Sequence, residues 1–446
     1  MAPNYKRPES PVPLEKADTT KPNITVVSWE DFFQSPDLQR VIKTALENNR
    51  DLRIANLNME TARQTHNVVR SNLFPTLDAN GSAVYQKLPP QSANFGHERE
   101  YSTDLDVISY ELDFFGKLRS LKKSAWEDFL ATKEARNITE ISLITSTAQA
   151  YVNFILDSKI LKSAEENLDA QNQNYKFAKL RYDSGVDSQT NLLLASDGMQ
   201  NADAVYQTYK RLVVEDKNAL MVLMGVFDET ALPKNIDIKD VKINDSLLNS
   251  TPSQLLLSRP DIKEAEHQLK AANANIGAAR AAFFPSITLT GTAGYQSTQL
   301  SDLFHSETWF FNPQIDVPIF TAGRGIANLK IANLRKKIEI ANYEKAIQTA
   351  FSEASNELAQ REAVVSRLNS FNEILSSREK NYNITELKYK EGISSQSTVI
   401  SDHLLFLTAQ QNQANLEKEY ITNLITLYKV LGGGSALDDG DKKLSK

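Results

Sequence analysis

The side chains best suited to acid–base or metal chemistry in this sequence, its five histidines, are scattered along the chain. They show no metal-ligand spacing, and no nucleophile elbow, phosphate loop or dinucleotide fingerprint appears. The chain has no cysteine, which excludes disulfides, thiolate metal ligands and cysteine nucleophiles. We therefore predict a protein that is not an enzyme and carries no metal or other cofactor. The histidines are His66, His97, His267, His305 and His403.

A short polar segment centred on a glycine occurs twice and is the strongest candidate for a binding site. Residues 180–189 match residues 387–396 at an offset of 207, and the match continues without a gap to Gly225 and Gly432. Each copy has a glycine followed by an apolar residue and small polar residues. A glycine in such a place is typical of a left-handed helix cap between two antiparallel helices.

The duplication extends towards the N-terminus at a slightly different offset. Arg70, Phe74 and Pro75 reappear 210 residues later, so one half has a loop longer by three residues. A unit of about two hundred residues is too long for a solenoid repeat, which spans roughly 20 to 50. The sequence thus predicts a duplicated domain whose halves pack with pseudo-symmetry.

Composition excludes several classes of protein. Of the 446 residues, 41% are hydrophobic and 24% charged, and no apolar run approaches the roughly 20 residues of a membrane-spanning helix. The net charge of −6 argues against a nucleic-acid partner. No signal peptide is evident, and residues 1–36 form a polar, proline-containing arm that we expect to be extended.

Each half follows the pattern helix, hairpin, very long helix, turn, helix. The first helices are expected at residues 37–70 and 253–282 and end near a Phe-Pro pair, because proline cannot continue a helical ladder. Residues 116–181 and 323–388 contain no proline, and about 65 helical residues would span roughly 100 Å. Residues 138–155 carry small and branched residues at alternating spacings of three and four, which is typical of coiled coils.

Shorter helices, 189–224 and 395–431, return from the two turns. The boundaries predicted from these patterns are an extended arm 1–36, a first repeat 37–227, an equatorial connector 228–252, a second repeat 253–432 and a flexible tail 433–446.

The two hairpins, residues 75–113 and 285–320, alternate apolar and polar side chains. The alternation is poorer in the return strands. Leu105 and Val107 share one face but Ile108, Tyr110 and Leu112 the other, so we expect a bulge or a phase error there. Pro313 and Pro318 favour a bend or an edge-like position in the last strand. We also expect Trp309 and Phe310 to join Tyr85 and Tyr295 in an aromatic girdle at the membrane surface. The side chains predicted to face lipid are Leu77, Ala79, Ala83, Tyr85, Ile287, Leu289, Ala293 and Tyr295.

Strands of this length suit a tilted crossing of a bilayer, which takes about 9 to 11 residues. Four strands cannot close a barrel, and open sheet edges are not tolerated in lipid. Several chains must therefore share one barrel, and three copies with about twelve strands are the smallest sensible cyclic solution.

Segments spread over almost the whole chain resemble the TolC-type outer-membrane channel family, specifically the OprM-like outer-membrane factors of RND tripartite drug efflux pumps. The resembling segments are residues 3–8 (PNYKRP), 111–116 (ELDFFG), 259–262 (RPDI), 273–280 (NANIGAAR), 283–286 (FFPS), 318–323 (PIFTAG) and 428–434 (YKVLGGG).

The resemblance implies a homotrimer in the outer membrane of a Gram-negative bacterium. A twelve-stranded barrel would contact outer-membrane lipid and continue as a helical tunnel through the periplasm. The chain would be a passive duct for drugs or other small molecules, fed by an inner-membrane RND transporter through a periplasmic membrane-fusion adaptor. Family members begin with a lipidated cysteine just before the Pro-Asn-Tyr segment. Here Met1 and Ala2 stand in that place, so we expect that a signal and lipid anchor are missing from this sequence.

The resemblance also assigns roles to the repeated turns. They would dock the adaptor through Gly185, Val186, Asp187 and Ser188 and through Gly392, Ile393, Ser394 and Ser395. In the family, acidic residues six and nine positions after the second turn glycine ring the closed tunnel end. Thr398 and Ser401 occupy those positions here and Asp402 follows one step later, which puts an acidic gate in doubt.

Two alternatives stay open at this stage. One is the outer-membrane component of a type I protein-secretion system, which shares the same general family. The other, from a different class, is a soluble coiled-coil scaffold, which would explain the long helices but not the two alternating hairpins at equivalent places in the repeats.

Overall fold

The computed structural model describes residues 1–12, 28–88, 96–232, 238, 241–245 and 257–433. These residues form two compact units that the chain visits several times. Unit 1 contains Met1–Ser10, Leu57–Glu134 and Lys263–Ala346, and unit 2 contains Pro11–Asn56, Ala135–Ile262 and Ile347–Lys446. Most of the predicted connector, the tip of the first hairpin, the start of the predicted helix 253–282 and the predicted tail lie outside the described residues.

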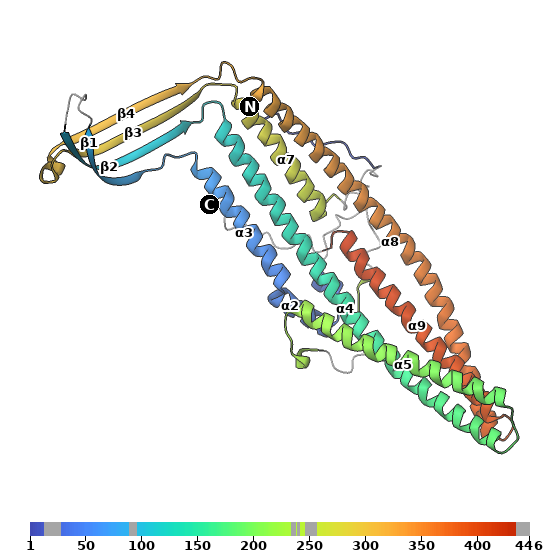
Figure 1. Ribbon diagram of the computed structural model, residues 1–446. Helices are drawn as coiled ribbons and strands as arrows, with labels where there is room; N and C mark the ends of the chain where they lie inside the picture. Colours follow the sequence, from blue (N-terminus) through green and yellow to red (C-terminus); the bar gives the residue numbers. More distant parts are fainter. Residues whose placement is uncertain (13–27, 89–95, 233–237, 239–240, 246–256, 434–446) are drawn as a thin grey trace. The chain divides into compact units, whose positions relative to one another are not determined.

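Unit 1 contains one antiparallel sheet of four strands in the order β1-β2-β3-β4 (Figure 1). Neighbours in the chain are neighbours in the sheet, so the two hairpins lie side by side through the pairing of β2 with β3. The strands are β1 (Asp78–Leu88), β2 (Gly96–Leu112), β3 (Ser286–Ser297) and β4 (Glu307–Asp316).

The pairing register gives this sheet one apolar and one polar face. Ala83 pairs with Tyr101, Leu105 with Ala293, and Ala293 with Trp309, so these side chains share a face. Seven of the eight residues predicted to face lipid lie on it, and Leu77 directly precedes β1 with the same alternation. The apolar side chains of this face are Ala79, Ala83, Tyr85, Tyr101, Leu105, Val107, Tyr110, Leu112, Ile287, Leu289, Ala293, Tyr295, Trp309, Phe311, Pro313 and Ile315. Towards the hairpin tips the same face also carries Lys87, Arg99, Thr103 and Glu307.

A bulge in β2 keeps that face continuous and confirms the predicted irregularity. The register shifts between Val107 and Tyr110, so two residues of β2 stand opposite the single residue Thr290. Ser109 takes a left-handed backbone with φ of 51°, and its N–H donates to the hydroxyl of Thr290 at 3.3 Å. Tyr110, which strict alternation from Val107 would place on the polar face, thereby returns to the apolar one.

The two outer strands of the sheet are β1 and β4. Of the two possibilities predicted for the last strand, a bend or an edge-like position, the structure shows the edge position, and Pro313, which has no backbone N–H, lies within β4. The expectation that Trp309 and Phe310 both belong to an aromatic girdle was wrong for Phe310. Phe310 pairs with Thr292 and lies on the polar face, whereas Phe311 shares the apolar face with Trp309.

Among the described residues, six helices are longer than 20 residues. They are α3 (Arg50–Ser71), α7 (Pro260–Ala281), two helices of 67 residues each, α4 (Lys117–Asp183) and α8 (Arg324–Lys390), and the returning helices α5 (Gln189–Met224) and α9 (Gln396–Val430). In the parts of the chain that the structure describes, none of the helices has the length and hydropathy needed to cross a membrane.

The helix expected at residues 37–70 is two helices, α2 (Pro36–Asn48) and α3, because Asn49 interrupts it. The Asn49 side-chain oxygen accepts from the N–H groups of Asp51 and Leu52, at 2.9 and 3.0 Å, and so caps the start of α3. Its amide nitrogen donates to the carbonyl of Leu223 at 3.0 Å, at the end of α5.

The second repeat makes the same contact with a different side chain. Arg259, which is 210 residues after Asn49, donates from its guanidinium to the carbonyl of Val430 at 2.8 Å. Val430 in turn lies 207 residues after Leu223. Arg259 is 8% exposed and also binds Asp261 and Glu353, at 2.7 and 2.8 Å. In both repeats, the residue just before α3 or α7 therefore donates a hydrogen bond to the end of the returning helix, α5 or α9.

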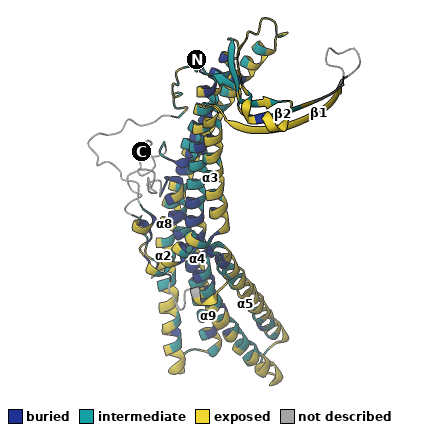
Figure 2. Ribbon diagram, turned by 90° about the vertical axis from the view of Figure 1, so that its left-hand side faces the viewer, coloured by how far each residue is buried: buried dark blue, intermediate teal, exposed yellow. Residues whose placement is uncertain are grey.

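The core of unit 2 is built on the short helix α1 (Trp29–Phe32). The Phe32 ring stacks on Tyr428 of α9 at 4.5 Å between centroids, and Phe33 meets both rings edge-on. These aromatic rings pack with buried residues of α4 such as Tyr151 and Leu156. Figure 2 colours the buried parts of the chain dark blue. The coiled-coil spacing predicted for α4 is confirmed by the burial of Ile141, Thr145, Ala148, Val152 and Ile155.

Two carboxylates and one ammonium group meet where α4, α5 and α9 pack in unit 2. Both oxygens of Asp157 (α4) accept from the Lys418 ammonium (α9) at 3.2 Å. The buried Oδ2 of Asp216 (α5) has no donor beside it. Burial and the facing Asp157 raise the pKa of Asp216 to about 7, since a hydrogen bond between the two carboxyl groups requires one of them to carry a proton.

This pair predicts a pH dependence of stability. An acid with a raised pKa stabilises the fold while it is protonated, so this contribution is lost as the pH rises through about 7. We expect the thermal midpoint of the purified protein to fall as the pH rises from about 4, the ordinary pKa of an aspartic acid, to about 7. Asp216→Asn, which imitates the protonated acid, removes part of that fall. An unchanged pH profile in the variant would contradict the assignment to Asp216.

Candidate functional site: the helical hairpin tips

The two turns that join the long helices to their returning helices have the same backbone. In the first, the Gly185 N–H donates to the carbonyl of Tyr182 at 2.9 Å and the Val186 N–H to that of Arg181 at 3.0 Å. In the second, Gly392 donates to Tyr389 at 2.9 Å and Ile393 to Lys388 at 2.8 Å. This pair of bonds is the Schellman motif, which satisfies the last carbonyls of a helix.

Both glycines are required by the backbone of the turn and not by crowding. Each has φ of +73°, which L side chains rarely adopt, and a Cβ atom at either position would meet nothing within 4 Å. The next helices start on serine caps, since the Ser188 hydroxyl accepts from the N–H of Asn191 and the Ser395 hydroxyl from that of Thr398.

An apolar side chain projects from each turn into solvent. Val186 is 66% exposed and Ile393 is 75% exposed, although each directly follows the cap glycine. Apolar groups at equivalent exposed places on two tips are a natural contact for a partner protein. The structure therefore places four predicted docking residues together on each tip.

The first tip contains an ion pair between Arg181 and Asp187, and the second tip has no equivalent pair among its described residues. The Asp187 carboxylate accepts from the side chain of Asn191 at 2.6 Å, from the Ser188 N–H at 2.8 Å and from the Arg181 Nε at 3.0 Å. These hydrogen bonds lower the pKa of Asp187 below its ordinary value, the bond from Asn191 most of all. In the second tip Lys388 and Ser394 stand at the places of Arg181 and Asp187, and Ser394 donates from its backbone to the Lys388 carbonyl at 3.2 Å.

The three gate candidates have different surroundings. Thr398 belongs to the cap of α9, where its hydroxyl lies 2.9 Å from that of Ser395, and Ser401 is exposed. Asp402 accepts a hydrogen bond of 2.5 Å from the Thr385 hydroxyl on α8, and Thr385 is buried. Asp402 thus joins the two helices of its hairpin, which sequence spacing could not indicate.

An aromatic stack next to Asp402 was also missed by the sequence reasoning. The Tyr382 ring lies 4.6 Å from the His403 ring and 6.0 Å from Phe406, in parallel planes. Burial lowers the pKa of His403. Because Tyr382 is 21 residues from His403 across the turn, no local pattern reveals the contact. Among the described residues, no three histidine or carboxylate side chains lie together in a way that could hold a metal ion.

Comparison with known proteins decides the family. Residues 41–226 and 251–433 match the family model described as outer membrane efflux protein. The chain belongs to the outer membrane efflux protein family. Its place is the outer membrane and its function is efflux, in a family of transport channels and not of enzymes.

Individual relatives agree over nearly the full length. The chain is 38% identical to the toluene efflux pump outer membrane protein TtgC of Pseudomonas putida over 450 residues, which cover 97% of this chain and 92% of TtgC. It is 36% identical to the probable outer membrane lipoprotein SilC of Salmonella typhimurium, covering 97% and 95% of the two chains.

A solved channel structure has the same fold. The open state of the Neisseria gonorrhoeae MtrE outer membrane channel superimposes with a TM-score of 0.86 at 34% identity, covering 97% of this chain and 98% of MtrE. The fold class predicted from the sequence, long helical hairpins with four strands per chain, is confirmed.

The tip glycines can be tested without a partner. Gly392→Ala places a Cβ on a left-handed residue, which costs roughly 1–2 kcal/mol. The Ile393 amide donates the Schellman bond to the Lys388 carbonyl. We expect this amide to exchange its hydrogen about fivefold faster or more in the variant. Gly392→Asn is the matched control, because asparagine tolerates this backbone. Equal protection in wild type and the alanine variant would show that the bond does not hold the tip.

Proposed function

We propose that three copies of this chain form a passive export duct with one shared barrel. The observation that carries the proposal is the sheet itself, which has an apolar face and two unpaired edge strands, β1 and β4. In lipid, unpaired backbone groups cost several kcal/mol each, so β1 of one copy would pair with β4 of the next. Three sheets of four strands close the barrel with the apolar face towards lipid.

The polar face of the sheet then lines the lumen. Among the side chains that the structure describes on the four strands, this face carries six carboxylates and no lysine or arginine. A lumen of this sign favours cations over anions. The carboxylates are Asp78, Glu100, Asp104, Asp106, Glu111 and Asp316.

We further propose that the two tips dock the hairpins of a periplasmic adaptor, which connects the chain to an inner-membrane RND transporter. The exposed Val186 and Ile393 support this role, since they offer apolar contact area held in place by a rigid turn. Asp187 and Ser188, with Ser394 and Ser395, supply polar contacts around them.

The gate follows from the same arrangement. We infer that opening separates α8 from α9 near their tip and breaks the bond between Thr385 and Asp402, while Thr398 and Ser401 line the narrow end without charge. We also propose a lipid anchor for this protein, since the relative SilC is named a probable outer membrane lipoprotein.

Small apolar compounds are the substrates that the relatives favour, since TtgC is named for the efflux of toluene. A type I protein-secretion role remains the alternative, because the channel architecture would serve either cargo. Export of a toxic solvent or drug in cells that lack their own channel separates the two.

The docking proposal predicts a loss of export from a change at the tips. Val186→Asp combined with Ile393→Asp removes the apolar contacts but keeps both glycine caps. We expect drug resistance to fall to the level of cells without the channel, while the protein still reaches the membrane in normal amount. Val186→Ile combined with Ile393→Val, which keeps both side chains apolar, is expected to leave resistance unchanged. Full resistance in the aspartate variant would refute docking through these residues.

The orientation of the sheet has its own test. Leu289→Arg places a cation on the apolar face in the first third of β3. A lipid-facing cation costs roughly 2–4 kcal/mol at the bilayer midplane and less towards the interface. We expect the membrane-inserted fraction to drop strongly. Thr290→Arg, one residue away on the polar face, is expected to insert normally. The opposite result would mean that the polar face meets the lipid.

A further inference from the structure

A basic groove lies between α3 and α4 in unit 1, close to the sheet. It encloses about 460 Å³ and is lined by six residues, of which four are cationic and none is a carboxylate. Such a concentration of one charge is unusual in a chain with a net charge of −6. The lining residues are His66 and Arg70 from α3, with Arg119, Lys122, Lys123 and Trp126 from α4.

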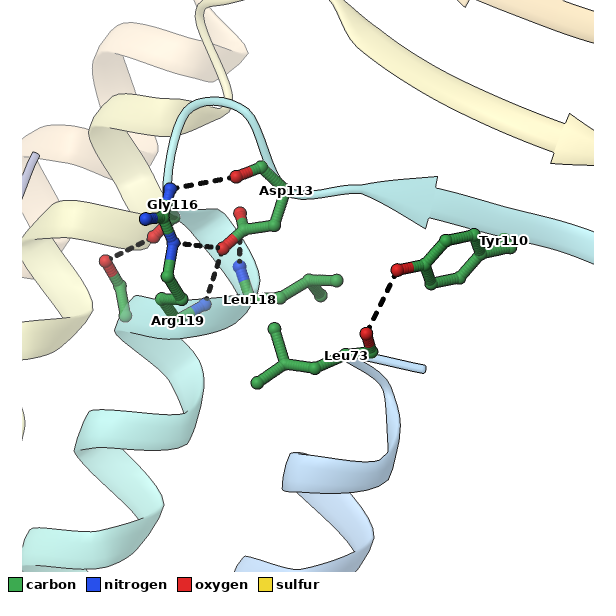
Figure 3. Close-up of polar contacts among 7 residues, drawn as sticks. Leu73, Tyr110, Asp113, Gly116, Leu118 and Arg119 are labelled. Carbon is green, nitrogen blue, oxygen red and sulfur yellow. Dashed lines mark hydrogen bonds and ion pairs between the residues drawn. The ribbon is translucent and has the colours of Figure 1, made fainter. Parts of the chain in front are cut away.

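Three of the four cations have no counter-ion among the residues that the structure describes. Arg119 is the exception, since its Nε binds the Asp113 carboxylate at 2.9 Å and its terminal nitrogen the Asp113 carbonyl at 2.9 Å (Figure 3). Within the residues that the structure describes, neither Arg70 nor Lys122 nor Lys123 forms an ion pair. Like charges gathered in one groove repel each other, and an anionic ligand would remove that repulsion.

A largely buried histidine lies at the wall of the groove. The His66 side chain is 8% exposed and packs edge-on against the Trp126 ring at 5.2 Å. Burial, and to a lesser extent Lys122 and Arg70, lower the pKa of His66, so the imidazole is neutral at neutral pH. A neutral imidazole still has one N–H to donate, and no acceptor for it lies within the described part of the chain.

The groove begins where the apolar face of the sheet ends. Tyr110, on that face, donates its hydroxyl to the carbonyl of Leu73 at 3.0 Å, and Arg70 precedes Leu73 by three residues (Figure 3). The following residues Phe74 and Leu77 are 61% and 67% exposed. Arg70 and His66 therefore lie roughly 5 to 10 Å before Leu73 along the helix, which matches a lipid headgroup layer of about 5 to 8 Å.

We propose that this groove binds the phosphate group of an anionic phospholipid in the periplasmic leaflet of the outer membrane. The proposal rests on the proposed orientation of the apolar face towards lipid. Arg70 provides a fork of donors for the phosphate oxygens, Lys122 and Lys123 provide charge, and His66 donates its N–H. Trp126 packs against the lipid at the membrane surface, where tryptophan is enriched. A free phosphate ion would use neither this ring nor the apolar residues above it.

The test is a titration of the purified full-length protein in detergent, with bound lipid counted by native mass spectrometry. The probes are phosphatidylglycerol, the neutral phosphatidylcholine, and inorganic phosphate alone. We expect phosphatidylglycerol to bind about tenfold more tightly than phosphatidylcholine and to raise the thermal midpoint. Equal binding of the two lipids, or equal stabilisation by inorganic phosphate, would overturn the proposal.

The triple variant Arg70→Gln, Lys122→Gln, Lys123→Gln should lose the preference for the anionic lipid. It should remain folded, because none of the three cations is paired. The matched control is Lys162→Gln, Lys176→Gln, Lys179→Gln, which removes the same charge from α4 at least 39 residues further along. That is roughly 60 Å of helix and too far from the bilayer. Loss of preference in both variants alike would show a general charge effect and contradict a specific groove.

The outcome separates this proposal from the proposed function. If Leu289→Arg impairs insertion as expected and the lipids still bind equally, only the groove assignment fails. If insertion shows that the sheet faces the other way, the proposed orientation fails and the headgroup assignment fails with it.

Discussion

The constraint on which the rest of the structure depends is the need to pair the edges of the β-sheet. The sheet of four strands presents an apolar face of more than a dozen side chains and leaves the outer edges of β1 and β4 without partners. Water would satisfy the edges but not the face, and lipid would satisfy the face but not the edges. Closure with further copies satisfies both. Because α4 starts five residues after β2, closure of the sheet also fixes where each copy begins its first long helix.

The two repeats share the same backbone contacts but form them with different side chains. Asn49 and Arg259 hold equivalent carbonyls, yet Asn49 does so as a helix cap and Arg259 as a buried cation with two carboxylate partners. The tips follow the same rule, since both are Schellman turns but only the first is locked by an ion pair. Two tips with one backbone and different polar groups can bind similar partners with different strength.

Much of this architecture could be predicted from the sequence because it depends on local rules. Alternation identified the apolar face of the strands, the faulty alternation before Tyr110 indicated the bulge, and the glycines marked both tips. The break at Asn49 could not be predicted, since it depends on the Leu223 carbonyl far away in the sequence. The contact between Thr385 and Asp402 crosses a turn, and the basic groove joins two helices more than forty residues apart. Such features arise from packing, and periodicity carries no information about them.

The measurement that tests this account most directly is the mass of the purified full-length chain, in detergent and without it. The account predicts a stable particle of three chains in detergent, and aggregation or loss from solution when detergent is removed, because the apolar face then meets water. A monodisperse monomer or dimer in buffer without detergent would contradict it. Such a result would mean that the apolar face and both sheet edges are satisfied within the single chain, and the coiled-coil scaffold would become the better explanation.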